Sequence, residues 1–201
     1  ELDGILVPGG FGSSGVEGKI NAIKYARENS IPYLGLCYGM QLAIIEFARN
    51  VLGLNDANSN EINKDTKNPV IDIIPSQKSF LEEKDYGATM RLGSYEASLL
   101  DSTLVKSLYE KYGKIKINNT ISERHRHRYE VSPNYTSLLE SAGMKISGFH
   151  VRSDGTKLVE FIELPSHKFF VATQSHPEFK SRLESPAPLF LGFVKACLSK
   201  N

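Results

Sequence analysis

The residues best suited to chemistry surround one cysteine, in the segment Gly35-Leu-Cys-Tyr-Gly39. A short apolar run precedes Cys37 and a long apolar segment follows it, which predicts a tight strand-to-helix turn that presents the sulfur as a nucleophile. Backbone N–H groups at the start of the helix would favour the reactive thiolate. A buried structural cysteine, which behaves as a small apolar side chain, is the alternative interpretation of Cys37 alone.

A histidine and a carboxylate could complete a catalytic site with this cysteine. His176-Pro-Glu178 follows the apolar run 169–174, so we expect His176 at the carboxyl edge of the sheet, where Cys37 also lies. His176 would then act as general base and acid, with Glu178 orienting its imidazole. Alone, this pair could equally be a surface pair. Cys197, on the apolar face of the last predicted helix, is interpreted as structural.

A glycine-rich segment, Gly9-Gly-Phe-Gly12, follows the first predicted strand. It could place the N–H of Gly10 beside the N–H of Tyr38, so that both donate to an oxyanion. A phosphate cradle is the alternative. Because no Gly-Lys-Ser/Thr follows the glycines, a Walker-type nucleotide site is not supported.

A dense basic cluster occupies residues 123–130. Strand alternation would place Arg124, Arg126 and Arg128 on one face and the histidines on the other. Phosphate or RNA contact, carboxylate binding and a solvated edge strand all remain open for this segment. The formal net charge of +1 makes nucleic acid the least favoured partner.

Short apolar runs alternate with helical periodicities along the chain, which predicts one α/β domain over residues 1–201. We expect three layers, with a mostly parallel sheet and helices on both faces. The first helix should begin at a capping box formed by Ser14 and Glu17. The expected strands are 4–8, 32–36, 69–74, 144–151, 157–163 and 169–174, with further strands within 86–131. The expected helices are 14–29, 39–52, 104–112, 133–142 and 186–198.

The composition is that of an ordinary globular protein, with 40% hydrophobic and 23% charged residues in 201. It excludes a largely disordered chain and a fibre. No run approaches the about 20 apolar residues of a membrane span, so we expect no membrane partner. Two cysteines give no disulfide framework, which favours a reducing compartment, the cytoplasm.

Three of these motifs together resemble the signatures of class I glutamine amidotransferases: Pro8–Gly12, Gly35–Gln41 and His176–Glu178. Further segments are similar to the glutaminase domains of the CTP synthase family, and this resemblance covers nearly the whole chain. These segments are Glu46–Asn50, Gly87–Gly93, Glu123–Val131, His176–Arg182 and Pro188–Gly192. The resemblance implies a flavodoxin-like core.

The resemblance also implies a mechanism. Cys37 would attack the side-chain amide of L-glutamine and form a glutamyl thioester, with His176 and Glu178 completing the triad. Gly10 and Tyr38 would form the oxyanion hole. The glutamine-binding residues would be Gly10, Tyr38, Gln41, Glu61 and Arg128.

For the whole enzyme, the resemblance implies a synthetase domain in the same polypeptide, which uses ATP and Mg²⁺ and forms a homotetramer. GTP would stimulate glutamine hydrolysis, while this domain itself would hold no cofactor and no metal. We expect the chain to lack the synthetase domain and the first strand and helix of the glutaminase domain.

The sequence departs from the family pattern at several positions. Tyr38 replaces a smaller aliphatic residue, Ser175 an aromatic one and Ala88 a glycine, and segment 147–155 should lengthen a hairpin. The glutaminase of GMP synthetase, a γ-glutamyl hydrolase and a catalytically silent module are the alternatives.

Overall fold

A seven-stranded sheet runs through the centre of the computed structural model, which describes residues 2–73 and 90–199. Its strands lie in the order β1-β2-β10-β9-β8-β5-β6. They are β1 (Ile5–Val7), β2 (Tyr33–Leu36), β10 (Phe170–Thr173), β9 (Lys157–Glu163), β8 (Lys145–Val151), β5 (Arg91–Leu99) and β6 (Thr120–His127). A small second sheet pairs β4 (Pro69–Asp72) with β3 (Asn58–Ser59) and β7 (Glu130–Val131).

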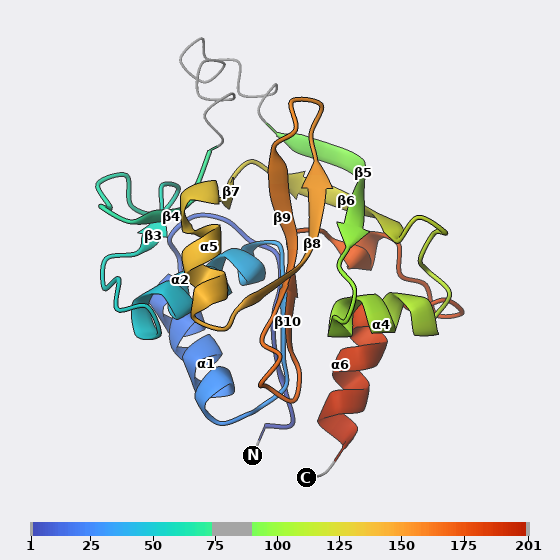
Figure 1. Cartoon of the computed structure of the whole chain (residues 1–201). Helices are drawn as coiled ribbons and strands as arrows, with labels where there is room; N and C mark the ends of the chain where they lie inside the picture. The colour runs from blue at the N-terminus through green and yellow to red at the C-terminus, as the bar shows by residue number, and fades with distance from the viewer. Residues whose placement is uncertain (1, 74–89, 200–201) are drawn as a thin grey trace.

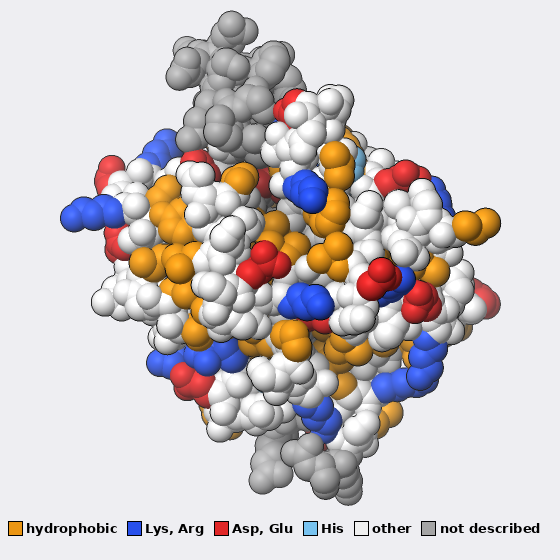
Figure 2. Space-filling model, viewed as in Figure 1, with side chains coloured by type: hydrophobic (Ala, Val, Ile, Leu, Met, Phe, Trp, Pro, Cys, Tyr) orange, Lys and Arg blue, Asp and Glu red, His pale blue; other side chains and the backbone are white. Residues whose placement is uncertain are grey.

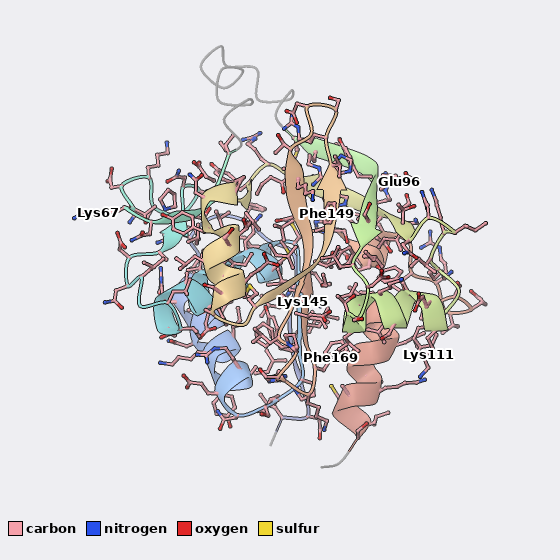
Figure 3. The ribbon with its side chains drawn as sticks, viewed as in Figure 1. Lys67, Glu96, Lys111, Lys145, Phe149 and Phe169 are labelled. Atoms are coloured by element: carbon pink, nitrogen blue, oxygen red, sulfur yellow. The ribbon has the colours of Figure 1, made fainter. Side chains whose placement is uncertain are left out.

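Helices cover both faces of the large sheet, as predicted (Figure 1). Helices α1 (Val16–Glu28), α2 (Tyr38–Asn50) and α5 (Pro133–Ser141) pack on one face, and α4 (Leu104–Lys111) and α6 (Pro188–Leu198) on the other. Phe169 lies between β10 and α6, where its ring centroid is 6.0 Å from that of Phe193 (Figure 3). The three-layer α/β architecture is therefore confirmed.

The strand directions correct one expectation. The sheet is parallel only across β1, β2 and β10, and every neighbouring pair from β10 to β6 is antiparallel. The prediction of a mostly parallel sheet is wrong for this half because its strands are joined differently. Only residues 152–156 join β8 to β9, and so short a connection allows only an antiparallel hairpin.

Most predicted elements exist close to their expected bounds, but the start of α1 does not follow the prediction. Gly15 precedes the helix with a φ of +65°, and no side chain caps it, so the capping box of Ser14 and Glu17 does not form. The predicted hairpin over 147–155 is the β8–β9 hairpin. Ala88 lies outside the described residues.

The surface mixes charges of both signs on the face shown in Figure 2, with small apolar areas between them. Within residues 2–73 and 90–199, none of the helices has the length and apolar character needed to cross a bilayer.

The turn from β2 into α2 is the most constrained backbone near the predicted site. Cys37 adopts φ +50° and ψ −101°, a conformation that side chains with a Cβ rarely adopt. A Cβ on Gly39 would lie 2.2 Å from the carbonyl oxygen of Val7, and one on Gly35 would lie 2.9 Å from the Cβ of Ala172. The glycines on either side of Cys37 are therefore required by close packing.

Gly39→Ala should lower the free energy of unfolding by about 1–3 kcal/mol, because the added methyl group would meet rigid backbone of β1. Urea unfolding would measure this. Gly18→Ala is the matched control, since Gly18 is an exposed residue of α1 with nothing within 4 Å of a built Cβ. Gly18→Ala should raise the free energy of unfolding by up to about 1 kcal/mol. Equal effects of the two substitutions would contradict the packing argument.

Candidate active site

Cys37 lies where three elements meet. Its N–H donates to the carbonyl of Thr173 at the end of β10 (2.7 Å), and its own carbonyl accepts from the N–H groups of Met40 and Gln41 in α2 (3.0 and 3.2 Å). The Gln174 side-chain amide donates to the sulfur at 3.6 Å. The sulfur is therefore fixed by the strands beneath it and by the helix that begins after it.

His176 and Glu178 follow β10, which pairs in parallel with β2, so they lie at the same sheet edge as Cys37. Glu178 Oε1 lies 2.6 Å from His176 Nδ1, and the ring of Phe179 stacks on the imidazole with centroids 4.9 Å apart. His176 Nε2 is buried and has no hydrogen-bond partner among the described residues. This nitrogen is the one left to exchange a proton with a substrate or nucleophile.

The Cys37 thiol is neutral at rest. Burial raises its pKa to about 12, and the charges of Glu178 and Glu130 add to this, while hydrogen bonds from the Tyr38 N–H and Gln174 lower it by less. The expected help from the helix N–H groups is present, but burial outweighs it. The sulfur therefore becomes a nucleophile only when its proton is removed.

The glycine-rich segment Pro8–Gly12, which we call the glycine loop, lies against the first residue of α2. A Cβ on Gly10 would lie 3.3 Å from the Tyr38 ring. Gly12 donates its N–H to Glu61 Oε1 at 3.0 Å and accepts a hydrogen bond from the Tyr38 hydroxyl. The structure thus brings together Gly10, Tyr38 and Glu61, which are far apart in sequence.

One cavity of about 610 Å³ joins the candidate residues. Every predicted site residue except Tyr38 lines it, and Tyr38 packs behind Gly10. The predicted residues in its wall are Gly10, Cys37, Gln41, Glu61, Arg128, His176 and Glu178, and the additional ones include Met90, Arg126, His127, Tyr129 and Phe179. The Tyr129 carbonyl accepts a hydrogen bond from Gln41 Nε2 at 2.9 Å.

Phe179 is one residue beyond Glu178, but nothing in its residue type indicated a place beside the histidine.

Beside this cavity, five charged or titratable side chains form a buried ion cluster that the sequence did not predict. Its members are Arg91, His125, His127, Glu130 and Glu160. Arg91 Nη1 contacts Glu160 Oε1 at 2.7 Å and Glu130 Oε1 at 3.1 Å. His127 Nε2 lies 2.7 Å from Glu130, and His125 Nε2 lies 3.3 Å from Glu160. The cluster ties β5, β6, β7 and β9 together beside the strand end that carries Arg128.

The predicted alternation is confirmed within β6, because Arg124 and Arg126 are exposed while His125 and His127 are buried. It does not extend to Arg128, which lies one residue beyond the strand and is half-buried. Burial lowers the pKa of His125 to about 2, helped by the charge of Arg91, so this imidazole is neutral. Burial alone would raise the pKa of Glu130, but His127 and Arg91 outweigh it and lower that pKa. The histidines of the basic cluster thus belong to the buried support of the site.

Cys197, the second cysteine considered in the sequence, lies away from the candidate active site. Cys197 is half-buried in α6, and a Cβ on Gly4 would meet its sulfur, so it packs at the opposite end of β1 from the cavity. Within the part of the chain that the structure describes, no group of three or more His, Cys, Asp or Glu side chains has the geometry to hold a metal ion.

Comparison with known proteins decides the family. The family model "Glutamine amidotransferase class-I" matches residues 1–196. The chain belongs to this family. As a class I glutamine amidotransferase, it has its signature residues gathered around the one cavity described above.

Curated relatives of this amidotransferase are CTP synthases. It is 56% identical over 201 residues to the CTP synthase of Methanocaldococcus jannaschii and 54% identical over 198 residues to that of Saccharolobus solfataricus. These matches cover 100% and 98% of the chain but 35% and 34% of the two relatives. The chain therefore spans about a third of the length of the CTP synthases it matches.

Solved structures agree with this assignment. The glutaminase domain of Trypanosoma brucei CTPS with bound acivicin matches with a TM-score of 0.87 and 42% identity, over 99% of this chain and 72% of that one. A Thermoplasma acidophilum protein that is named as a GMP synthase subunit matches with a TM-score of 0.55 and 16% identity, over 98% of this chain and 73% of that one. The second likeness supports the fold alone.

The buried thiol of this amidotransferase predicts a distinctive pH dependence. In a Cys197→Ser variant, alkylation of Cys37 by iodoacetamide should accelerate about tenfold per pH unit from pH 7 to pH 9, because a raised pKa keeps the thiolate fraction small and rising throughout this range. Mass spectrometry of the labelled protein would give the rates, with free cysteine as the reference that levels off above its pKa of about 8.5. A plateau for Cys37 below pH 8 would contradict the neutral resting thiol.

Proposed function

We propose that this chain hydrolyses L-glutamine to glutamate and ammonia through a cysteine thioester, and that the ammonia serves the ATP-dependent amination of UTP to CTP. The observation that carries the proposal is the convergence of Cys37, the His176–Glu178 pair and the glycine loop on one cavity. High identity to CTP synthases along the whole chain supports the second half of the proposal.

Opposite charges in the cavity wall suit an α-amino acid. Arg128 is assigned to the α-carboxylate of glutamine, since a guanidinium fork matches a carboxylate. Glu61 is assigned to the α-ammonium group, and Gln41, which also lines the cavity, contributes to binding the α-substituents. Glu61 already accepts a hydrogen bond from Gly12, so its carboxylate is oriented before substrate arrives. This arrangement would direct the side-chain amide of glutamine toward Cys37.

The first half-reaction breaks the amide. His176 Nε2 takes the thiol proton as the Cys37 sulfur bonds to the amide carbon, and the carbonyl oxygen becomes an oxyanion that accepts hydrogen bonds from the N–H groups of Gly10 and Tyr38. The imidazolium, held by Glu178, then gives its proton to the leaving nitrogen. The C–N bond breaks, ammonia leaves, and a glutamyl thioester remains on Cys37.

The second half-reaction returns the enzyme to its starting state. His176 Nε2 takes a proton from water while the water oxygen bonds to the thioester carbon, and the same two N–H groups hold the new oxyanion. The C–S bond breaks, the sulfur recovers a proton from His176, and glutamate leaves. Because the resting thiol is neutral, one imidazole carries every proton in both halves.

The remaining steps are proposed for the whole enzyme. A synthetase domain of the same polypeptide would activate UTP with ATP and Mg²⁺ and receive the ammonia, in a cytoplasmic homotetramer stimulated by GTP. The names of the relatives, and the third of their length that this chain spans, support a partner domain of this kind. A catalytically silent module is disfavoured because the triad is complete and lines an open cavity.

Cys37→Ala in the full-length gene product should reduce glutamine hydrolysis and glutamine-dependent CTP formation by at least about a thousandfold, because the nucleophile is gone. CTP formation from added ammonia should stay within about twofold of wild type, since that route bypasses the cavity. Cys197→Ser is the matched control and should preserve both activities. Glutamine hydrolysis by the Cys37→Ala protein at the wild-type rate would refute the proposed mechanism.

A further inference from the structure

The glycine loop is held mainly through Gly12. The N–H of this residue donates to Glu61 and its carbonyl accepts from the Tyr38 hydroxyl, so both of its main-chain groups are bound by side chains from other segments. Phe11, the largest side chain of the loop, is 85% exposed and gives no anchor. Three glycines in five residues leave the loop with little conformational preference of its own. Its position is therefore set by the side chains that contact it, which are Tyr38 and Glu61 at Gly10 and Gly12 and His176 at Gly9.

Tyr38 makes contact with both of these glycines. Its ring packs against Gly10, its hydroxyl reaches Gly12, and the side chain is almost completely buried. The same residue begins α2, and its backbone N–H hydrogen-bonds the Cys37 sulfur. Burial raises the pKa of Tyr38 to about 12, so the phenol remains a proton donor throughout the neutral range.

We propose that the Tyr38 side chain is a positioning residue that sets the width of the oxyanion hole, and this rests on the proposed glutaminase function. One donor of the hole is the N–H of Tyr38 itself, and the other belongs to Gly10. The Tyr38 ring and hydroxyl fix the loop that carries Gly10 relative to the helix that carries Tyr38. A single residue thus supplies one donor and places the other.

This arrangement predicts an effect mainly on the chemical step. The oxyanion exists only in the tetrahedral states, so misplacing one donor weakens their binding while leaving the bound amide nearly unaffected. Arg128, Glu61 and Gln41, which are assigned to the α-substituents of glutamine, keep their side chains when the Tyr38 hydroxyl is removed, although the hydrogen bond from the Gly12 N–H to Glu61 loosens with the loop. Loss of the hydroxyl should therefore lower kcat by more than it raises KM.

The test is Tyr38→Phe in the full-length gene product, which removes one oxygen atom and keeps the ring. We expect kcat for glutamine hydrolysis to fall about tenfold, less than the 10²–10³ lost when an oxyanion donor is deleted, with KM within about twofold. The Cys37 sulfur adds to the aldehyde carbon of glutamate γ-semialdehyde, an analogue of glutamine, while His176 takes the thiol proton. The tetrahedral adduct therefore carries an oxyanion that needs the same two donors. The inhibition constant of the semialdehyde should rise by the factor lost in kcat, while that of L-glutamate stays constant.

Tyr109→Phe is the matched control. Tyr109 is a fully buried residue of α4 whose hydroxyl donates to Glu123, in the core on the other face of the sheet. The Tyr109→Phe protein should have a lower free energy of unfolding than wild type but the same kcat. Hydrogen exchange provides a readout independent of activity, because the loop peptide should exchange faster in Tyr38→Phe and at the wild-type rate in Tyr109→Phe.

Two results would overturn the proposal while leaving the glutaminase function intact. One is a Tyr38→Phe enzyme whose kcat lies within twofold of wild type. The other is an equal loss of kcat in Tyr38→Phe and Tyr109→Phe, which would indicate general destabilisation. Failure of the proposed function would look different, since the wild-type protein itself would then not hydrolyse glutamine.

Discussion

The close contact between the start of α2 and the end of β1 is the constraint on which the site depends. Gly39 approaches the Val7 carbonyl so closely that no side chain fits between them, and this contact holds Cys37 in its positive-φ turn. It also places the glycine loop, which follows β1 directly, beside the nucleophile. The parallel pairing of β2 with β10 then brings His176 to the same edge. A short run of backbone packing thus assembles residues from three separate segments.

Burial is both a cost and an advantage in this arrangement. It raises the pKa of Cys37 and so suppresses the thiolate, but it also excludes water from the sulfur and strengthens every hydrogen bond offered to an oxyanion. The buried ion cluster lies beside the same cavity, and its His127 lines the cavity wall. There, burial is tolerated because Arg91 compensates the charge of Glu130, and because burial raises the pKa of Glu160 to about 8, so that this carboxyl is largely protonated near neutral pH. The catalytic thiol and the ion cluster therefore share one low-dielectric region, in which the thiol is neutral while Arg91 and Glu130 form a charged pair.

Local sequence predicted the parts of the site that depend on local structure. The turn at Cys37 and the His176–Glu178 pair each follow an apolar run, so their positions at a sheet edge could be derived from short segments. The direction of the outer strands could not, because it depends on the path that the chain takes between them rather than on apolar periodicity. The buried ion cluster was also not predicted, because Arg91 and Glu160 meet the histidines only when the part of the sheet from β9 through β8 and β5 to β6 has formed. The sequence predicts the Tyr38 N–H as an oxyanion donor, but the contact of the Tyr38 side chain with Gly12 depends on the tertiary structure.

The central claim, that Cys37 is the nucleophile of a glutamine-binding cavity, is tested most directly by a chloroketone analogue of glutamine. Its chloromethyl carbon should bond to the Cys37 sulfur with loss of chloride, and peptide mass spectrometry would locate the adduct. The account predicts modification at Cys37 alone, slowed in proportion to added L-glutamine. Modification at Cys197 or elsewhere, or modification of Cys37 that glutamine does not slow, would contradict it.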